Sequence, residues 1–304
     1  MNKLLTILGA TATGKTNLAA HLAYEINGEI ISADSRQVYR KLDIGTGKDL
    51  NDYVVSQQQI PHHLIDIHDV GYEYNVFEFQ EDFHKAYQDI QSRNKTAIFC
   101  GGTGMYIQAV LDGYKLYPVP KNEILRKELE LKSEEELVKQ LKSISTLHNS
   151  TDTKSKARTI KAIEIALYCN QKNIEKEIFP HLDSVVFGIS MERSLVKEKI
   201  TKRLKERLKG GMVEEVEQLL KEGITYEQLK FLGLEYRFLA LFLNQELSYS
   251  EMERKLNIAI HQFSKRQMTW FRRMEKQGHQ IHWIDGEMTM EEKVNLINKT
   301  WSSC

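Results

Sequence analysis

Residues 9–16 read GATATGKT and match the phosphate-binding pattern G-x-x-x-x-G-K-S/T in full. The apolar run KLLTIL at residues 3–8 precedes this stretch and a helical pattern follows it, which is the context that makes the pattern informative. Gly9 and Gly14 permit backbone angles that turn successive N–H groups toward an anion, and Lys15 adds a positive charge. The sequence therefore predicts a phosphate-binding loop between the first strand and the first helix.

Such a loop recognises a diphosphate and does not distinguish the group that the diphosphate carries. Its amides and the helix N-terminus suit anionic oxygens, and the hydroxyl of Thr16 suits Mg²⁺. We therefore expect the diphosphate-binding residues to be Gly9, Ala10, Thr11, Ala12, Thr13, Gly14, Lys15 and Thr16.

Further apolar runs, separated by helical patterns, predict a mostly parallel sheet. They are EIISA near Ile30, HHLID near Leu64, TAIFCGG from Thr96 and SVVFGIS at residues 184–190. Helical patterns at residues 17–25 and 76–91 separate the early runs, as in repeated β-α-β units. The expected fold class is α/β, a P-loop parallel sheet core flanked by helices. Everything after Ser190 is expected to be helical.

The middle of the chain differs in composition from the rest. It is highly charged and helix-rich, as in ILRKELELKSEEELVKQLKSI at residues 124–144, and prolines stand near both of its borders. The simplest interpretation is a helical insertion subdomain formed by residues 118–182. Residues 1–117 and 183–304 then form the catalytic core.

Composition limits the classes of partner and compartment. The chain has 304 residues and a formal net charge of zero, so the site for any polyanionic partner must be a local patch. Its three cysteines show no C-x-x-C spacing, which argues against a disulfide framework and a zinc site and favours a reducing compartment. No run approaches the roughly 20 apolar residues that a membrane span needs. A cytoplasmic protein without membrane contact is expected.

The phosphate loop alone leaves the reaction open. A nucleotide kinase is the usual owner of such a loop, and it needs an acidic residue that holds the metal at the end of a strand. Asp34 follows the second predicted strand and could play that part. From these residues alone, a P-loop kinase of a nucleotide or small metabolite is therefore a possible function.

Four blocks of sequence narrow the choice. They are ISADSRQVYRKLDIGTGK (residues 31–48), PHHLIDI (61–67), GGTGMYIQAVLDG (101–113) and KRQMTWFRR (265–273). Together they resemble the tRNA dimethylallyltransferase family, also called tRNA isopentenyltransferase, in the same order and from Leu5 to about Arg273. The resemblance implies that the loop holds dimethylallyl diphosphate with Mg²⁺. The prenyl group would pass to N6 of the adenosine next to the anticodon (position 37 of the tRNA), and diphosphate would leave.

The resemblance also assigns the catalytic groups. An exocyclic adenine amine is a weak nucleophile, so a base must take its proton as the C–N bond forms, and Asp34 matches the family's general base. Thr103 matches a residue near the bridging oxygen and the incoming amine, although its type also suits a helix N-cap. Arg203 lies on a helix whose Ile200, Leu204 and Leu208 should face the core, and it matches a diphosphate contact.

A base in the anticodon arm must be flipped out to reach such a site. In residues 256–274, Leu256, Ile260, Phe263, Trp270 and Met274 should bury one helix face, with Gln267 as a polar interruption, and the basic side chains should project elsewhere. The resemblance implies tRNA contacts at Asp34, Ser35, Arg36, Gln37, Thr103, Arg126, Arg158, Thr159, Ile160, Lys161, Ala162, Lys265, Arg266 and Arg272.

Departures from the family pattern at Lys161, Glu235, His261 and Gln262 bear on tRNA preference and leave the predicted base and phosphate loop intact. The chain ends at Cys304 without the zinc finger of eukaryotic relatives, so a bacterial type is expected. We also expect the protein to act as a monomer. A kinase and a non-catalytic RNA-binding protein with a vestigial phosphate loop are the two alternatives.

Overall fold

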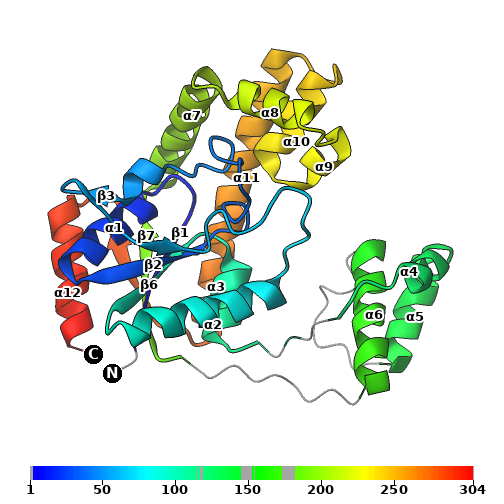
Figure 1. Cartoon of the computed structure of the whole chain (residues 1–304), viewed down its shortest axis with the longest axis horizontal. Coiled ribbons are helices and arrows are strands. Elements are labelled where there is room, and N and C mark those ends of the chain that lie inside the picture. Colours follow the sequence, from blue (N-terminus) through cyan, green and yellow to red (C-terminus); the bar gives the residue numbers. More distant parts are fainter. Residues whose placement is uncertain are drawn as a thin grey trace. The chain divides into compact units, whose positions relative to one another are not determined.

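The computed structural model describes residues 3–114, 116, 119–144, 153, 155–172 and 182–303. The chain divides into two compact units (Figure 1). Unit 1 comprises Met1–Gly113 and His181–Cys304, and unit 2 comprises Tyr114–Pro180. The border that the sequence analysis placed between residues 117 and 118, and the chain end at Cys304, lie outside the described residues.

Unit 1 is built on a parallel sheet with the strand order β5-β2-β6-β1-β7-β8. The strands are β1 (Leu4–Gly9), β2 (Gly28–Ala33), β5 (His62–His63), β6 (Thr96–Gly101), β7 (Ser184–Ser190) and β8 (Ile281–Asp285). The first strand is central, because β1 pairs with β6 on one side and β7 on the other. The phosphate loop therefore leaves the middle of the sheet, where chains on both sides can reach it.

Two sequence-based expectations about strands need correction. The run HHLID is a strand only at His62–His63, because Leu64 and Asp66 have positive φ angles of 63° and 55°, which a strand does not tolerate. The expectation that everything after Ser190 is helical is wrong, since β8 pairs in parallel with β7. The strand β8 lies at the edge of the sheet and is only partly buried, which allows it to carry polar residues.

Helices cover both faces of the sheet (Figure 1). The side chains of β1 alternate between them, with Leu4 and Leu8 in one core cluster and Leu5 and Ile7 in the other. One face packs against α2 (Val76–Ser92), α3 (Gly104–Leu111) and the C-terminal part of α11 (Tyr249–Lys276), and the other against α1 (Lys15–Glu25) and α12 (Met290–Ser302). A short 3-10 helix (Leu50–Tyr53) and the antiparallel pair β3 (Val54–Val55) and β4 (Gln58–Gln59) follow β2.

A third core cluster joins the remaining helices of unit 1 to the loop after β2. The helices are α7 (Arg193–Lys209), α8 (Met212–Lys221), α9 (Tyr226–Phe231), α10 (Leu234–Leu243) and the first half of α11. Val38, Tyr39 and Leu42 of the loop are buried among them, together with Tyr236 of α10. This packing fixes the loop that follows Asp34 against a helical wall.

The buried face of α11 differs in part from the expected one. Leu256, Ile260 and Met274 are buried as predicted, but Phe263 is 38% exposed and Trp270 is only partly buried. The buried positions are Met252, Leu256, Ile260, Ser264, Gln267, Phe271 and Met274, which follow the helical period more closely than the predicted set. Gln267, which we expected to interrupt the apolar face, is itself buried on that face.

Unit 2 consists of α4 (Glu123–Glu130), α5 (Glu134–Ile144) and α6 (Lys156–Lys172) around a small apolar core that includes Leu129, Leu137 and Ile163. No helix in the described ranges of either unit is long and apolar enough to cross a membrane.

Candidate active site

The phosphate loop joins the buried end of β1 to the start of α1. Gly14 occupies the N-cap position of α1 with φ 80°, and Ala12 also has a positive φ of 64°. The Thr13 hydroxyl donates to the Ala10 carbonyl at 2.9 Å, and the Lys15 ammonium donates to the same oxygen at 2.6 Å. The loop is therefore held in shape by its own side chains.

Two cations meet at this loop. Arg203 of α7 donates a hydrogen bond to the Thr11 hydroxyl. Burial, and to a smaller extent the charge of Arg203, lower the pKa of Lys15 to about 8. Burial and the neighbouring Arg207 lower the pKa of Arg203 to about 10. Because a nearby anion would stabilise the charged form of both groups, this part of the cavity suits an anionic ligand such as a diphosphate.

Asp34 stands directly after β2, at the carboxyl edge of the sheet. Its Oδ1 accepts hydrogen bonds from the backbone N–H of Arg36 at 2.8 Å and of Gln37 at 3.3 Å. Within the described part of the chain, Oδ2 receives no hydrogen bond. One carboxylate oxygen thus orients the group, and the other is available to accept a proton.

Thr103 lies next to Asp34, after the neighbouring strand β6. Its hydroxyl accepts a hydrogen bond from the Ser35 N–H at 3.1 Å, and its own N–H donates to the Ala33 carbonyl at 3.1 Å. Thr103 is the N-cap residue of α3, but its hydroxyl makes no cap hydrogen bond to that helix. A Cβ at Gly101 would lie 2.4 Å from the Ala33 carbonyl oxygen, which explains why a glycine allows the two strand ends to approach so closely.

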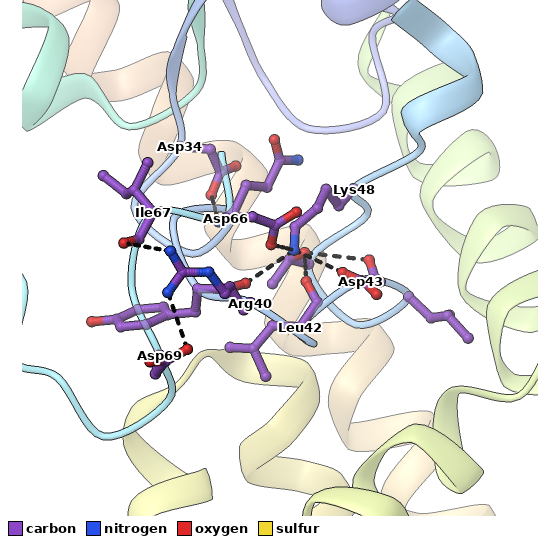
Figure 2. Close-up of polar contacts among 12 residues, drawn as sticks. Asp34, Arg40, Leu42, Asp43, Lys48, Asp66, Ile67 and Asp69 are labelled. Atoms are coloured by element: carbon purple, nitrogen blue, oxygen red, sulfur yellow. Dashed lines mark hydrogen bonds and ion pairs between the residues drawn. The ribbon is translucent and has the colours of Figure 1, made fainter. Parts of the chain in front are cut away.

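The loop from Asp34 to Lys48 is fixed by a buried ammonium group, which Figure 2 shows among three acceptors. Lys48 has no exposed side-chain surface and donates to the Tyr39 carbonyl at 3.0 Å and to the carboxylates of Asp43, at 2.7 Å, and Asp66. Backbone bonds tie the same segments together, since the Asp66 N–H donates to the Gln37 carbonyl at 3.0 Å. The shape of the loop beside Asp34 therefore depends on Lys48.

Nearby, Arg40 fastens the outer side of this loop by donating to Asp69 at 3.1 Å and to the Ile67 carbonyl at 3.2 Å (Figure 2). Gln37 turns inward and donates from its amide to the Gly47 carbonyl at 3.1 Å. The Arg40 bonds tie the loop to the segment that contains Ile67 and Asp69, and the Gln37 bond ties the start of the loop to its end. All three bonds limit the movement of the loop.

Gln267 of α11 connects the two loops on which the predicted chemistry depends. Its Oε1 accepts from the Thr11 N–H at 2.8 Å, and its Nε2 donates to the Gly102 carbonyl at 2.9 Å. Sequence reasoning missed this role, although an amide on the apolar face of a helix signals a buried hydrogen-bonding task. The residue places the phosphate loop and the loop of Thr103 at a fixed separation.

Residues of the phosphate loop, together with Asp34, Thr103, Arg203 and Gln267, line one cavity of about 540 Å³ in unit 1. Glu235 of α10 also lines it, and burial raises the pKa of this carboxyl. The predicted site residues on the cavity wall are Thr11, Ala12, Gly14, Lys15, Thr16, Asp34, Ser35, Arg36, Gln37, Thr103, Arg203 and Arg266. Lys265 and Arg272 are exposed elsewhere on α11, and His261 and Gln262 lie on the same helix.

The donor set of the cavity fits Mg²⁺ held jointly with a diphosphate. Thr16 supplies a hydroxyl to the cavity. No group of three or more His, Cys, Asp or Glu side chains in the described ranges could hold a metal ion alone. Mg²⁺ commonly takes only one or two protein oxygens and completes its shell with phosphate and water.

The predicted tRNA contacts in unit 2 differ in accessibility. Arg158 and Lys161 are exposed on α6, and Ala162 is half-buried. The side chains of Thr159 and Ile160 are buried, so direct contact through them would require this core to open. Arg126 forms a two-pronged ion pair with the buried Glu164, with a shortest distance of 2.7 Å. The side chains of Thr159, Ile160 and Arg126 therefore support the fold of unit 2.

A parallel sheet with a glycine-bounded loop after its central strand, and with cations and a carboxylate around one cavity, defines a P-loop protein of the α/β class. The family model described as IPP transferase matches residues 37–274, and the model described as isopentenyl transferase matches residues 2–68. The chain belongs to the IPP transferase family, which includes the tRNA dimethylallyltransferases.

The sequence of this chain is similar to those of individual relatives over nearly its full length. The chain is 54% identical to tRNA dimethylallyltransferase 2 of Bacteroides fragilis over 97% of both chains, and 55% identical to tRNA dimethylallyltransferase 2 of Phocaeicola vulgatus over 97% of this chain and 96% of the other. A crystal structure of the tRNA isopentenylpyrophosphate transferase of Bacillus halodurans is 28% identical with a TM-score of 0.72, covering 100% of this chain and 96% of that one. A eukaryotic dimethylallyltransferase acting on tRNA, 22% identical with a TM-score of 0.78, covers 99% of this chain and 79% of that one and shares the fold.

Proposed function

We propose that this protein transfers the dimethylallyl group of dimethylallyl diphosphate to N6 of the adenosine next to the tRNA anticodon and releases diphosphate. Transfer of a dimethylallyl group to tRNA follows from the family and from the close relatives. The acceptor atom and the role of each side chain are the proposed part. One observation carries them, namely that Asp34 and the cations Lys15 and Arg203 line the same cavity.

On the donor side, negative charge builds on the diphosphate as its bond to the prenyl carbon breaks. Lys15 and Arg203 line the cavity beside the phosphate loop and would stabilise that charge as it develops, which is usually the largest single contribution to catalysis. Mg²⁺ would be held through Thr16 and would supply further positive charge to the leaving diphosphate.

On the acceptor side, the amine nitrogen forms a bond to the prenyl carbon and loses one proton. The free Oδ2 of Asp34 accepts that proton, and the Oδ1 bonds to Arg36 and Gln37 keep the carboxylate in place. The Thr103 hydroxyl, held by the Ser35 N–H, lines the same cavity and would lie near both reacting groups. The balance is one C–O bond broken, one C–N bond formed, and one proton transferred to Asp34.

The tRNA would be held by the exposed basic side chains. We assign phosphate contacts to Arg158 and Lys161 of unit 2 and to Lys265 and Arg272 of α11, because all four are exposed and positively charged. We further propose that the protein acts in the cytoplasm as a monomer.

The experiment compares donors on one unmodified tRNA. The protein is incubated with Mg²⁺ and either dimethylallyl diphosphate or ATP, and the nucleosides are analysed by mass spectrometry. The proposal expects dimethylallyl adenosine with the first donor and no change with ATP. Transfer of phosphate from ATP would establish a kinase, and tRNA binding without any product would establish a binding protein.

A further inference from the structure

Two phenylalanines at the cavity have open faces. Phe231, the last residue of α9, is 76% exposed, and Phe263 of α11 is 38% exposed. Single exposed apolar residues are ordinary and carry no meaning. These two, however, come from different helices and both line the cavity of about 540 Å³ that holds Asp34. Exposed aromatic surface from two helices therefore lines the cavity that holds Asp34.

The surroundings of the two rings are basic. Arg266 lies over the Phe263 ring, with its Cζ 5.9 Å from the ring centroid. Arg237 of α10 is exposed and lines the same cavity. Neither guanidinium forms a hydrogen bond or ion pair within the ranges that the structure describes. The patch thus combines aromatic faces with positive charges that have no protein counter-ion.

The segment after Phe231 leads directly to the acceptor side of the cavity. Leu232 is buried, which anchors the end of α9, and Gly233 follows with a φ of 138° that favours glycine. A Cβ at Gly233 would lie 3.8 Å from Cγ of Arg36. Phe231 therefore stands two residues from a backbone position that touches the loop of Asp34.

We propose that Phe231 and Phe263 stack against unstacked nucleobases of the substrate tRNA, on either side of the nucleotide that enters the cavity, while Arg237 and Arg266 contact the adjoining phosphates. The inference rests on the proposed function, since the RNA must deliver a nucleotide to Asp34. Aromatic faces beside arginines are the usual surface for unstacked RNA bases. An apolar protein partner would bury the same guanidinium groups without counter-charge, which is costly.

The test measures binding of an anticodon stem-loop RNA at several salt concentrations. Stacking contributes about 1–3 kcal/mol per base, so Phe231→Ala and Phe263→Ala should each raise the dissociation constant roughly 5- to 150-fold. The loss should be the same at every salt concentration, because no phosphate contact is removed. Arg266→Gln should instead lower the salt slope by roughly one unit. Tyr24→Ala is the matched control, since Tyr24 is 41% exposed on α1 and does not line the cavity.

Two substitutions separate aromatic stacking from simple apolar contact. Phe231→Trp should keep the affinity for RNA, and Phe231→Leu should lose it. Full affinity in Phe231→Leu, or affinities of both alanine variants within about twofold of Tyr24→Ala, would overturn the proposal. Dimethylallyl transfer by the wild-type protein is measured on the same RNA. If the wild type forms product but the phenylalanine variants bind RNA as tightly as the control, only the proposed stacking is contradicted. If the wild type forms no product, the proposed function itself is contradicted.

Discussion

At the scale of single residues, Asp34 combines two tasks in one carboxylate, because Oδ1 is fixed by two backbone N–H groups and Oδ2 is left to react. Asp34→Ala removes the proton acceptor without removing a positive charge that could hold RNA. We expect turnover to fall roughly 10²- to 10⁴-fold with tRNA affinity preserved. Single-turnover rates and RNA binding measure the two effects, and a rate within a few-fold of wild type would contradict the general-base role.

Lys15 leads to a prediction about pH. Burial lowers its pKa to about 8 in the free protein, and the nearby Cys100 thiol cannot compensate its charge because burial raises the Cys100 pKa to about 12. Lys15 must be protonated to attract diphosphate, so donor affinity should be full below pH 8 and fall by up to about tenfold per pH unit above it. Titration of dimethylallyl diphosphate binding against pH tests this.

The matched variant is Lys15→Met, which should bind the donor weakly and without that pH dependence. Its RNA affinity should be close to that of the wild type, because Lys15 lies on the phosphate loop and not among the residues assigned to tRNA. A Lys15→Met protein that loses donor and RNA affinity equally would mean that the phosphate loop has another role.

At the scale of elements, the loop from Asp34 to Lys48 is the part that depends most on one side chain. Lys48→Met keeps the length of the side chain and removes three hydrogen bonds to Tyr39, Asp43 and Asp66. Because small displacements of a catalytic group are costly, turnover should fall about 10²-fold while donor affinity stays within a few-fold. Lys41→Met is the control on the same loop, since Lys41 forms only an exposed ion pair with Glu222. Equal effects of the two variants on turnover would show that Lys48 does not position Asp34.

Local patterns predicted those elements whose cause is local. β1, the phosphate loop and α1 were predictable because glycine positions and an apolar run determine them. The strand β8 was missed because its place depends on pairing with β7 about 100 residues earlier in the chain, and its own polar residues do not suggest a strand. The role of Gln267 was missed for the same reason, since its partners lie far away in the sequence. The role of Lys48 was missed because its bond to Asp66 and its burial depend on how the loop folds back on the following segment.

At the scale of the whole molecule, a net charge of zero means that RNA affinity must come from a few exposed cations. Arg158→Glu combined with Arg272→Glu should raise the Michaelis constant for tRNA and lower its salt slope by roughly one unit per lost contact. The Michaelis constant for dimethylallyl diphosphate should stay unchanged. Lys299→Glu on α12 is a control, because Lys299 is exposed and does not line the cavity. An unchanged salt slope in the double variant would remove these arginines from the tRNA contacts.

The most direct test of the proposed chemistry uses two anticodon stem-loop RNAs that differ only in the nucleotide beside the anticodon. One carries adenosine and the other carries purine riboside, which lacks the exocyclic amine. With dimethylallyl diphosphate and Mg²⁺, mass spectrometry should find one dimethylallyl group on the adenosine RNA, one diphosphate released per group, and no product on the other RNA. A dimethylallyl group on the purine riboside RNA would contradict transfer to the amine.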